Sequence, residues 1–264
     1  MSTLTVAAVQ YDIQWLDKES NFHHLEKLFE KHFDENVAAD LLLLPETFST
    51  GFCINKEGVE ETENGGTTLK WLKKIAQQYN CVVAGSVLVS KNDKKVNRFY
   101  WVFSDGTVEH YDKRHLFRLG NEQDHVEQGQ NRKIITINGI KILPLVCYDL
   151  RFPVWSRNRQ DYDLMVNVAN WPALRRHVWD TLLKARAMEN QTFVVGVNRI
   201  GEDGRNTPHS GGTTIIDFSG ETIVCADDNQ QQIITTQLDF SKLEKFKDDF
   251  PAFLDADEFE LPVK

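Results

Sequence analysis

Three residues with reactive side chains, Glu46, Lys113 and Cys147, each stand where an apolar run of this 264-residue sequence stops. The polar turn 148–152 follows Cys147 at once and is closed by Pro153, a residue that favours the start of a helix. A strand that delivers a thiol to such a turn exposes the sulfur and leaves nearby backbone N–H groups unpaired. Ligands of α/β sheets gather at the carboxyl ends of strands, so we expect the three side chains to converge.

A thiol, a carboxylate and an ammonium together meet the needs of nucleophilic catalysis at a carbonyl carbon. The thiol attacks the carbon, a base takes the proton of the thiol, and a cation or N–H donors hold the oxyanion that forms. Each residue alone has a simpler explanation, because a cysteine that ends an apolar strand often only packs in a core. The combination of the three predicts an enzyme.

Short β-branched runs alternate with longer segments of helical periodicity in the first third of the chain and again after Cys147. This alternation is typical of a sheet with helices on its faces. The expected strands are 4–9, 40–44, 81–89, 98–103, 107–111, 133–137, 140–146, 164–168, 192–198, 213–218, 221–226 and 232–237, and the expected helices are 20–33, 67–79 and 173–189.

Turn-forming dipeptides predict antiparallel strands between and after the two α/β stretches. Asp105-Gly106 and Asn138-Gly139 favour the positive φ angles of tight hairpins, and Ser219-Gly220 turns a last meander of three strands. If each α/β stretch makes its own sheet, the fold is an α/β four-layer αββα sandwich of two mixed β-sheets flanked by helices. No linker or low-complexity tract divides the sequence, so we expect residues 1–264 to form a single domain.

The composition argues against several classes of partner. The formal net charge is −9, whereas nucleic acids and anionic membrane surfaces attract clustered lysine and arginine. We find no run of about 18 apolar residues and no leader at Met1, so we expect no membrane span, no signal peptide and a cytoplasmic location. The four cysteines form no C-x-x-C pair, which favours reduced thiols over a disulfide framework or a zinc site.

Three segments resemble the motifs of the nitrilase superfamily of carbon–nitrogen hydrolases, and they occur in the order of that family. They are Leu43-Leu44-Pro45-Glu46-Thr47-Phe48, Tyr111-Asp112-Lys113-Arg114-His115-Leu116-Phe117 and Val146-Cys147-Tyr148-Asp149-Leu150-Arg151-Phe152-Pro153. The likeness continues through 167–172, 184–190 and 210–213. It covers most of the chain and implies the same four-layer sandwich, assembled as a homodimer extended across helices.

The resemblance implies roles for the residues that match these motifs. Cys147 would be the nucleophile, Glu46 the general base and Lys113 the cation beside the tetrahedral intermediate, with the backbone N–H of Tyr148 completing the oxyanion site. Glu122 matches a second glutamate of the family and would orient the ammonium of Lys113 or the leaving ammonia. We expect Lys113 to favour a carboxylate at Glu46 and a thiolate at Cys147. No metal and no organic cofactor is required.

Within the superfamily, the string 147–153 and the segment 170–173, taken with Trp179 and 185–187, are most similar to the omega-amidases. That resemblance implies a small-molecule amide substrate, a dicarboxylic monoamide such as 2-oxoglutaramate or 2-oxosuccinamate, cleaved to the 2-oxo acid and ammonia through a cysteine thioester. The alternative is another amidase of the superfamily, acting on deaminated glutathione, an N-carbamoyl compound or an aliphatic amide. A true nitrilase is disfavoured, because that branch has tryptophan in place of Tyr148.

A substrate with a carboxylate and a ketone requires a cation besides Lys113. Arg175 and Arg176 are candidates, because a guanidinium binds a carboxylate in a bidentate fork, although both can equally face solvent. Arg151 is expected instead to pair with Asp149 or with another carboxylate of the same turn.

Four aromatic residues near the motifs are candidates for the walls of a narrow apolar slot around the substrate, the alternative being simple core packing. They are Phe48, Phe117, Tyr148 and Trp171. The C-terminal stretch 239–264 carries no motif, and its phenylalanines predict docking either on the same chain or on a partner subunit at a dimer interface.

Overall fold

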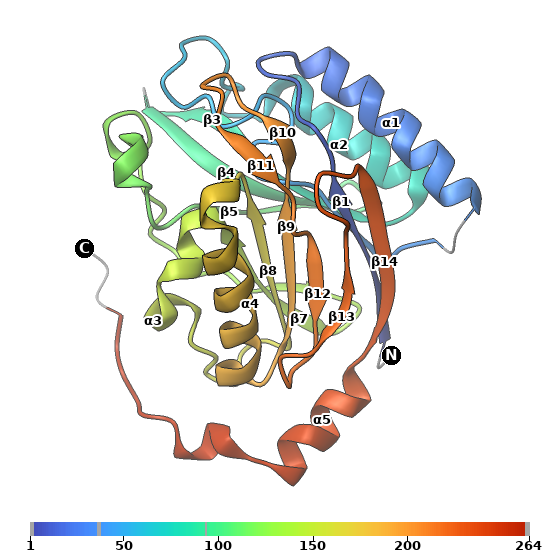
Figure 1. Cartoon of the computed structure of the whole chain (residues 1–264), viewed down its shortest axis with the longest axis vertical. Coiled ribbons are helices and arrows are strands. Elements are labelled where there is room, and N and C mark those ends of the chain that lie inside the picture. The colour runs from blue at the N-terminus through green and yellow to red at the C-terminus, as the bar shows by residue number, and fades with distance from the viewer. Residues whose placement is uncertain (1–2, 36–37, 93, 262–264) are drawn as a thin grey trace.

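The computed structural model describes residues 3–35, 38–92 and 94–261; the remaining residues of the expected domain 1–264 lie outside the described part. Two six-stranded sheets pack face to face, and helices cover their outer sides (Figure 1). Both sheets mix parallel and antiparallel neighbours. The predicted four-layer αββα sandwich is therefore confirmed.

The first sheet has the strand order β14-β1-β2-β3-β4-β5. Its centre is parallel, because β1, β2 and β3 run in the same direction, whereas β14, β4 and β5 add antiparallel strands on the two sides. The strands are β1 (Thr3–Gln10), β2 (Leu41–Leu43), β3 (Val82–Lys91), β4 (Lys94–Val102), β5 (Val108–Asp112) and β14 (Gln232–Asp239).

The second sheet has the order β13-β12-β9-β8-β7-β6, with β7, β8 and β9 parallel. The hairpins predicted around Gly106 and Gly139 are present as β4–β5 and β6–β7, and both glycines have positive φ angles of 89° and 86°. The strands are β6 (Ile135–Ile137), β7 (Ile140–Val146), β8 (Leu164–Ala169), β9 (Phe193–Asn198), β12 (Thr214–Ile216) and β13 (Thr222–Cys225).

Burial on both faces explains why the central strands are continuous apolar runs. In β1, Val6 and Ala8 belong to the core between the sheets, whereas Ala7 and Val9 belong to the core beneath the helices of the first sheet. Successive side chains of a strand point to opposite faces, so a sheet covered on both sides requires apolar residues at every position.

Four helices form the outer layers. α1 (Lys18–Glu35) and α2 (Gly66–Tyr79) cover the first sheet, and α3 (Pro153–Ser156) and α4 (Arg176–Asn190) lie over the second (Figure 1). Trp179 and Leu183 are fully buried on the face of α4 that packs on β9. The predicted helix 173–189 is divided in the structure, because its first turn is the separate 3₁₀ helix η4 (Ala173–Arg175).

Two parts of the strand prediction were wrong. The third strand of the expected meander, β14, leaves β13 and pairs along its whole length with β1 of the first sheet. A short hairpin was also missed, formed by β10 (Ile200–Glu202) and β11 (Pro208–Ser210). The Asp203-Gly204 dipeptide between these two strands is a turn signal that predicts such a hairpin.

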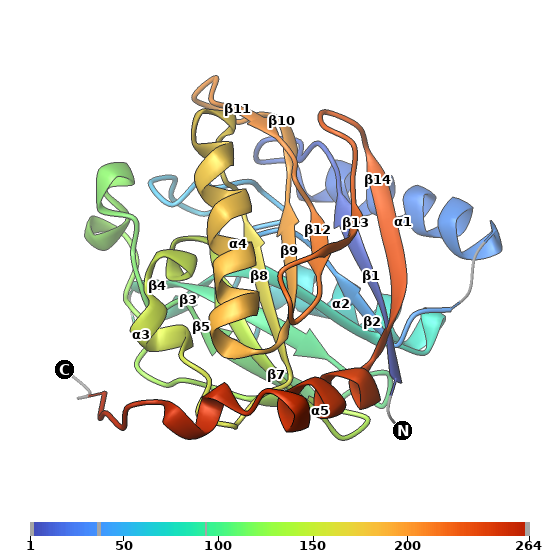
Figure 2. The same ribbon diagram turned by 60° about the horizontal axis from the view of Figure 1, so that its bottom comes forward.

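The C-terminal segment contacts its own chain. α5 (Phe240–Asp249) runs along one end of the sandwich, and the chain continues through η5 (Ala252–Asp255) towards α3 (Figure 2). Gln191 donates a hydrogen bond of 2.8 Å to the carbonyl of Phe250, and the Arg159 guanidinium lies 4.4 Å from the ring centre of Phe259. A role of 239–264 at a dimer interface stays a prediction, and residues 262–264 lie outside the described part.

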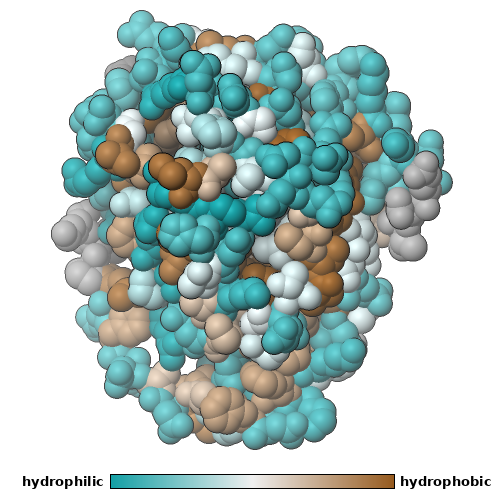
Figure 3. Space-filling view, in the orientation of Figure 1, coloured by the Kyte–Doolittle hydropathy of each residue, from teal (hydrophilic) through white to brown (hydrophobic). Residues whose placement is uncertain are grey.

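Hydrophilic residues cover most of the face seen in Figure 3, where apolar residues stand in small separate groups. In the part of the chain that the structure describes, none of the helices combines the length and the apolar character needed to span a membrane.

Candidate active site

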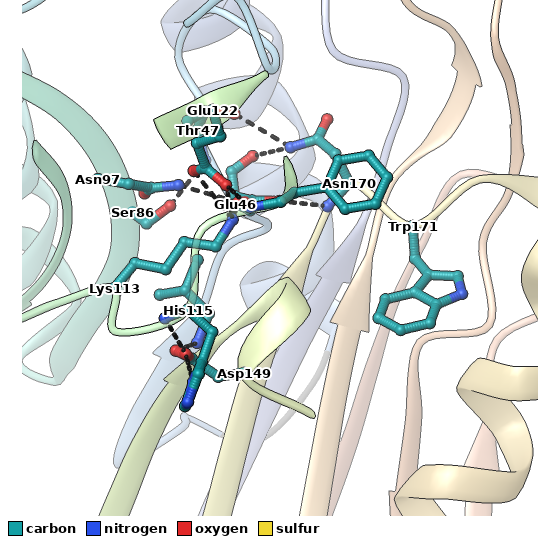
Figure 4. Close-up of polar contacts among 12 residues, drawn as sticks. Glu46, Thr47, Ser86, Asn97, Lys113, His115, Glu122, Asp149, Asn170 and Trp171 are labelled. Carbon is teal, nitrogen blue, oxygen red and sulfur yellow. Dashed lines mark hydrogen bonds and ion pairs between the residues drawn. The ribbon is translucent and has the colours of Figure 1, made fainter. Parts of the chain in front are cut away.

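The three sequence-predicted residues follow strands of both sheets. Glu46 comes three residues after β2, Lys113 directly after β5, and Cys147 directly after β7. The backbone of Lys113 is held on both sides, because its N–H donates to Asn97 O at 2.9 Å and its carbonyl accepts from Gly129 N at 2.7 Å. The fold thus brings Glu46 and Lys113, which are far apart in sequence, side by side (Figure 4).

The Glu46 carboxylate is fully buried and accepts hydrogen bonds from three sides. Oε1 accepts from Lys113 Nζ at 3.0 Å and from Asn97 Nδ2 at 2.9 Å. Oε2 accepts from the backbone N–H of Asn170 at 2.9 Å, and the Asn170 side chain donates to the backbone carbonyl of Glu46 at 2.6 Å. These donors hold the carboxylate in one orientation (Figure 4).

The ammonium of Lys113 lies between two carboxylates. Besides Glu46, it donates to Glu122 Oε1 at 3.1 Å and Oε2 at 3.0 Å. Burial disfavours the charge of Lys113, but Glu122 and Glu46 outweigh that effect and raise the pKa of the ammonium. Glu122 is fully buried in the 3₁₀ helix η2 (Glu122–Asp124), and burial is the main cause that raises its pKa. Glu122 is therefore not an exposed loop acid.

Cys147 begins the 3₁₀ helix η3 (Cys147–Arg151) with a positive φ angle of 48°. This left-handed conformation is uncommon for a residue with a side chain and makes a sharp turn directly after β7. The N–H groups of the first turn, including that of Tyr148, have no acceptor within a helix.

The electrostatic surroundings of Cys147 differ from the expectation. Burial, followed by the Glu46 carboxylate within hydrogen-bonding reach, raises the pKa of the thiol well above its ordinary value, and Lys113 lowers it by less. Lys113 favours a thiolate, as expected, but desolvation and the negative charge of Glu46 outweigh its effect on the pKa. The raised pKa favours a neutral thiol, and the Glu46 carboxylate beside it can accept the proton.

A pocket of about 120 Å³ opens above Cys147 and Lys113. The small volume fits a short linear substrate better than a drug-sized ligand. The pocket is lined by Phe52, Lys113, Phe117, Gly120, Cys147, Tyr148, Arg151, Asn170, Trp171, Pro172, Arg175, Asp203, Arg205, Thr207 and His209. Over residues 3–35, 38–92 and 94–261, no group of three or more His, Cys, Asp or Glu side chains could hold a metal ion.

Two of the arginines near the turn line the pocket. Arg151 lies over the ring of Trp171, 5.1 Å from its centre, and Arg175 over Phe117 at 5.4 Å. The expected pairing of Arg151 with a turn carboxylate was wrong, because among the described residues neither guanidinium forms an ion pair. Arg176 instead binds Asp180 and Asp228 outside the pocket.

The four candidate aromatic residues divide between the pocket and the core. Phe117, Tyr148 and Trp171 line the pocket. Phe48 does not: its ring is fully buried against Phe22 and Trp71, in the core beneath α1 and α2. Its position as a pocket wall was wrong, because the chain reverses at Thr47 and directs the ring to the opposite face of the first sheet.

Several residues of the site were missed from the sequence. Asn97 and Asn170 hold Glu46, and neither was predicted as a site residue, although Asn170 lies in the family-like segment 167–172. The β10–β11 hairpin supplies Arg205, Thr207 and His209 to the pocket. The hairpin also had a detectable signal, its Asp-Gly turn.

The carbon–nitrogen hydrolase family model matches residues 5–248. This chain therefore belongs to the carbon–nitrogen hydrolase family, and the predicted membership and amide-hydrolysing activity are confirmed.

Among its relatives is the omega-amidase YafV of Yersinia enterocolitica, which is 43% identical over 99% of this chain and 100% of the relative. The 2-oxoglutaramate amidase of Bacillus subtilis is 32% identical over 95% of this chain and 96% of the relative. The crystal structure of XC1258 from Xanthomonas campestris, a protein of the same superfamily, has a TM-score of 0.94 at 38% identity and covers 99% of this chain and 100% of that chain.

Proposed function

We propose that this enzyme cleaves the terminal amide of small dicarboxylic monoamides, such as 2-oxoglutaramate and 2-oxosuccinamate, to the 2-oxo acid and ammonia. The observation that carries the proposal is the meeting of the Cys147 thiol with Glu46 and Lys113 at a small pocket that also presents Arg151 and Arg175. The names of the omega-amidase and 2-oxoglutaramate amidase relatives support the same substrate class.

In the first half of the proposed reaction, Glu46 takes the thiol proton while Cys147 Sγ forms a bond to the amide carbon. The developing oxyanion is stabilised by the ammonium of Lys113 and the backbone N–H of Tyr148. Glu46 then passes its proton to the amide nitrogen, the carbon–nitrogen bond breaks, and ammonia leaves a thioester on Cys147. Glu122 keeps the ammonium in place through its two hydrogen bonds to Lys113.

In the second half, water attacks the thioester carbon. Glu46 takes a proton from this water, and the same oxyanion donors hold the second tetrahedral intermediate. The bond to sulfur breaks, the proton returns to the thiol, and the carboxylic acid product leaves. Both halves need only the residues named, so the proposed mechanism uses no metal and no organic cofactor.

The distal carboxylate of such a substrate needs a cation on the pocket wall. Arg151 and Arg175 supply guanidinium groups that have no ion-pair partner among the described residues, so they are available for a substrate anion. The rings of Trp171 and Phe117 support these guanidinium groups and exclude water from their planar faces. A short substrate can then place its amide at Cys147 and its carboxylate at an arginine.

The proposal is tested by measuring ammonia release from 2-oxoglutaramate, 2-oxosuccinamate, succinamate, glutamine, asparagine, carbamoyl-β-alanine and a nitrile. We expect the 2-oxo acid amides to have the highest kcat/KM and glutamine to be poor, because its α-ammonium is repelled by the cationic pocket. Preference for carbamoyl-β-alanine, a nitrile or a simple aliphatic amide would contradict the proposed substrate class.

Replacement of the nucleophile tests the proposed mechanism directly. Cys147→Ala should lower kcat at least 1,000-fold, roughly the loss seen when a covalent nucleophile is removed, with the circular dichroism spectrum and Tm near those of the wild type. Cys225→Ala, at an exposed cysteine, is the matched control and should keep full activity. Substantial ammonia release by Cys147→Ala would exclude the thioester route.

We also propose that the enzyme is a cytoplasmic homodimer that forms one domain per chain. Apolar side chains on the outer helices support a partner contact, since Val154 on α3 is 54% exposed and Met188 on α4 is 52% exposed. The acidic charge and the family model, which spans 5–248 without interruption, support a single domain with no nucleic-acid or membrane partner.

A further inference from the structure

A buried carboxylate outside the pocket lining, that of Asp149, joins the two loops that carry Cys147 and Lys113. Asp149 is fully buried in η3. Its Oδ2 accepts hydrogen bonds from Val146 N at 3.0 Å and from Tyr111 Oη at 2.8 Å. Its Oδ1 accepts from the backbone N–H of His115 at 2.8 Å and from His115 Nδ1 at 2.8 Å (Figure 4).

The positions of these donors relate directly to the two reactive groups. Val146 immediately precedes Cys147, whereas Tyr111 and His115 stand two residues before and two residues after Lys113. One carboxylate therefore contacts the backbone beside the thiol and both sides of the loop that carries the ammonium. We propose that Asp149 is a positioning residue that holds the turn of Cys147 at a fixed distance from Lys113 and its partner Glu46.

The hydrogen-bond pattern requires a carboxylate at this position. Each oxygen accepts from one backbone N–H, Val146 on one side and His115 on the other, and a backbone N–H can only donate. An amide has a single acceptor oxygen, so either orientation would turn an NH₂ group towards one of these N–H donors. The hydroxyl of Tyr111 can rotate and the imidazole of His115 can change tautomer, but the two backbone donors cannot adapt.

Further contacts stabilise the connection between the loops that carry Cys147 and Lys113. Tyr111 Oη also accepts from Trp155 Nε1 at 3.1 Å and from Arg114 N at 3.2 Å. The His115 ring stacks on Phe152, with 3.8 Å between ring centres and 8° between planes. The left-handed conformation of Cys147 is costly by itself and persists only where surrounding contacts determine it. The hydrogen bonds of Asp149 beside Cys147 provide such contacts.

The inference rests on the proposed roles of Cys147, Glu46 and Lys113, and the test uses Asp149→Asn in the full-length protein. We expect kcat for the best amide to fall about 100-fold with KM changed by less than about threefold, because a displacement of roughly 1 Å at the reacting groups costs this much. A thiol that moves away from Glu46 should also titrate lower. The midpoint of the pH profile for alkylation of Cys147 by iodoacetamide should therefore fall by about one pH unit.

The matched control is Glu61→Gln, because Glu61 is another buried carboxylate with several donors, including Thr67 N and Thr68 N at the start of α2. It should lower Tm and leave kcat and the alkylation profile unchanged. Tyr111→Phe is the second variant. It removes one donor to Asp149 and the acceptor of Trp155 Nε1 and Arg114 N, but keeps both backbone N–H bonds to Asp149, and it should lower kcat about 3- to 10-fold without changing KM.

An Asp149→Asn protein that folds and has the kcat and alkylation profile of the wild type would overturn the inference. If Asp149→Asn does not fold, an unchanged kcat and an unchanged alkylation profile in Tyr111→Phe would overturn it equally. If the wild type hydrolyses no amide of the panel, the proposed function fails, while the alkylation profiles still decide the role of Asp149.

Discussion

At the scale of single residues, burial and then the charges around Cys147 raise the pKa of its thiol. Two carboxylates, Glu46 and Glu122, surround one ammonium, that of Lys113, and all three are buried. A thiolate would add a third negative charge to a desolvated site, and this raises the pKa of the thiol. In the proposed mechanism the nucleophile is therefore formed during attack, with Glu46 as base, rather than stored as a thiolate.

The neutral thiol leads to a test in solution without any amide. The rate of Cys147 alkylation by iodoacetamide should still be rising above about pH 9, because only the thiolate reacts and its pKa is raised. The measurement is the pH dependence of modification of the Cys147 peptide by mass spectrometry. A rate that becomes constant below about pH 8 would show a stored thiolate and contradict the assignment.

The pocket arginines lead to a prediction about substrate charge. Arg151→Gln should raise KM for succinamate roughly 10- to 100-fold, because the substrate carboxylate loses a charge-assisted hydrogen bond. The KM for butyramide, which has no carboxylate, should change little. Arg176→Gln is the matched control, because Arg176 is already paired with Asp180 and Asp228 outside the pocket. Equal effects of Arg151→Gln on the charged and the neutral amide would exclude a carboxylate site at Arg151.

At the scale of elements, the site depends on short segments that follow strands rather than on the strands themselves. η3 positions Cys147, η2 positions Glu122, and the β10–β11 hairpin closes one side of the pocket. The hairpin is held by Arg199, whose buried guanidinium donates to Glu202 O at 3.0 Å and to Asp12 Oδ1 at 2.9 Å. A substitution that breaks the contacts of Arg199 should therefore move the hairpin and change the shape of the pocket.

His209 on β11 makes the hairpin sensitive to acid. Burial and the nearby Arg199 lower the pKa of His209 to about 4, so the folded state holds a neutral imidazole while the unfolded chain binds a proton below about pH 6.5. The unfolding free energy should therefore fall by about 2 kcal/mol from this residue as the pH drops from 7 to 5. His209→Gln should lose this part of the pH dependence in urea unfolding at the two pH values.

The exposed His177 supplies the control for this measurement, and His177→Gln should keep the pH dependence of the wild type. An unchanged difference between pH 7 and pH 5 in His209→Gln would show that other groups cause the acid sensitivity.

At the scale of the whole molecule, β14 connects the two sheets of the sandwich. β14 follows the second sheet in sequence but pairs with β1 of the first sheet over eight residue pairs. α5 and the C-terminal segment then return beneath the second sheet to α3 (Figure 2). The two halves of the site cannot separate without breaking this strand pairing.

The proposed homodimer is a prediction at this scale. Light scattering after size-exclusion chromatography should give a mass of about twice the 30.4 kDa of the chain. Replacement of the exposed apolar residues Val154 and Met188 by glutamate should shift the mass towards that of one chain, because charges at a partner contact lose their hydration. A wild-type protein with the mass of a single chain would contradict the dimer.

The sequence by itself determined the layers of the fold and the three reactive residues of the site. Apolar periodicity depends on which faces of a strand or helix are buried, and the motif segments place Glu46, Lys113 and Cys147 at strand ends. Tertiary structure alone decided the partner of β14, because the apolar pattern of a strand predicts the strand but does not identify the sheet in which it pairs.

Tertiary structure also decided the direction of Phe48, the freedom of Arg151 and the neutral state of the Cys147 thiol. The direction of Phe48 follows from the turn at Thr47, whereas the states of Arg151 and Cys147 depend on charges and burial contributed by segments distant in sequence. Asn170 and Asp149 contact residues of the first sheet only when the two sheets pack together, and Asn97 reaches Glu46 only when β4 takes its place in the first sheet.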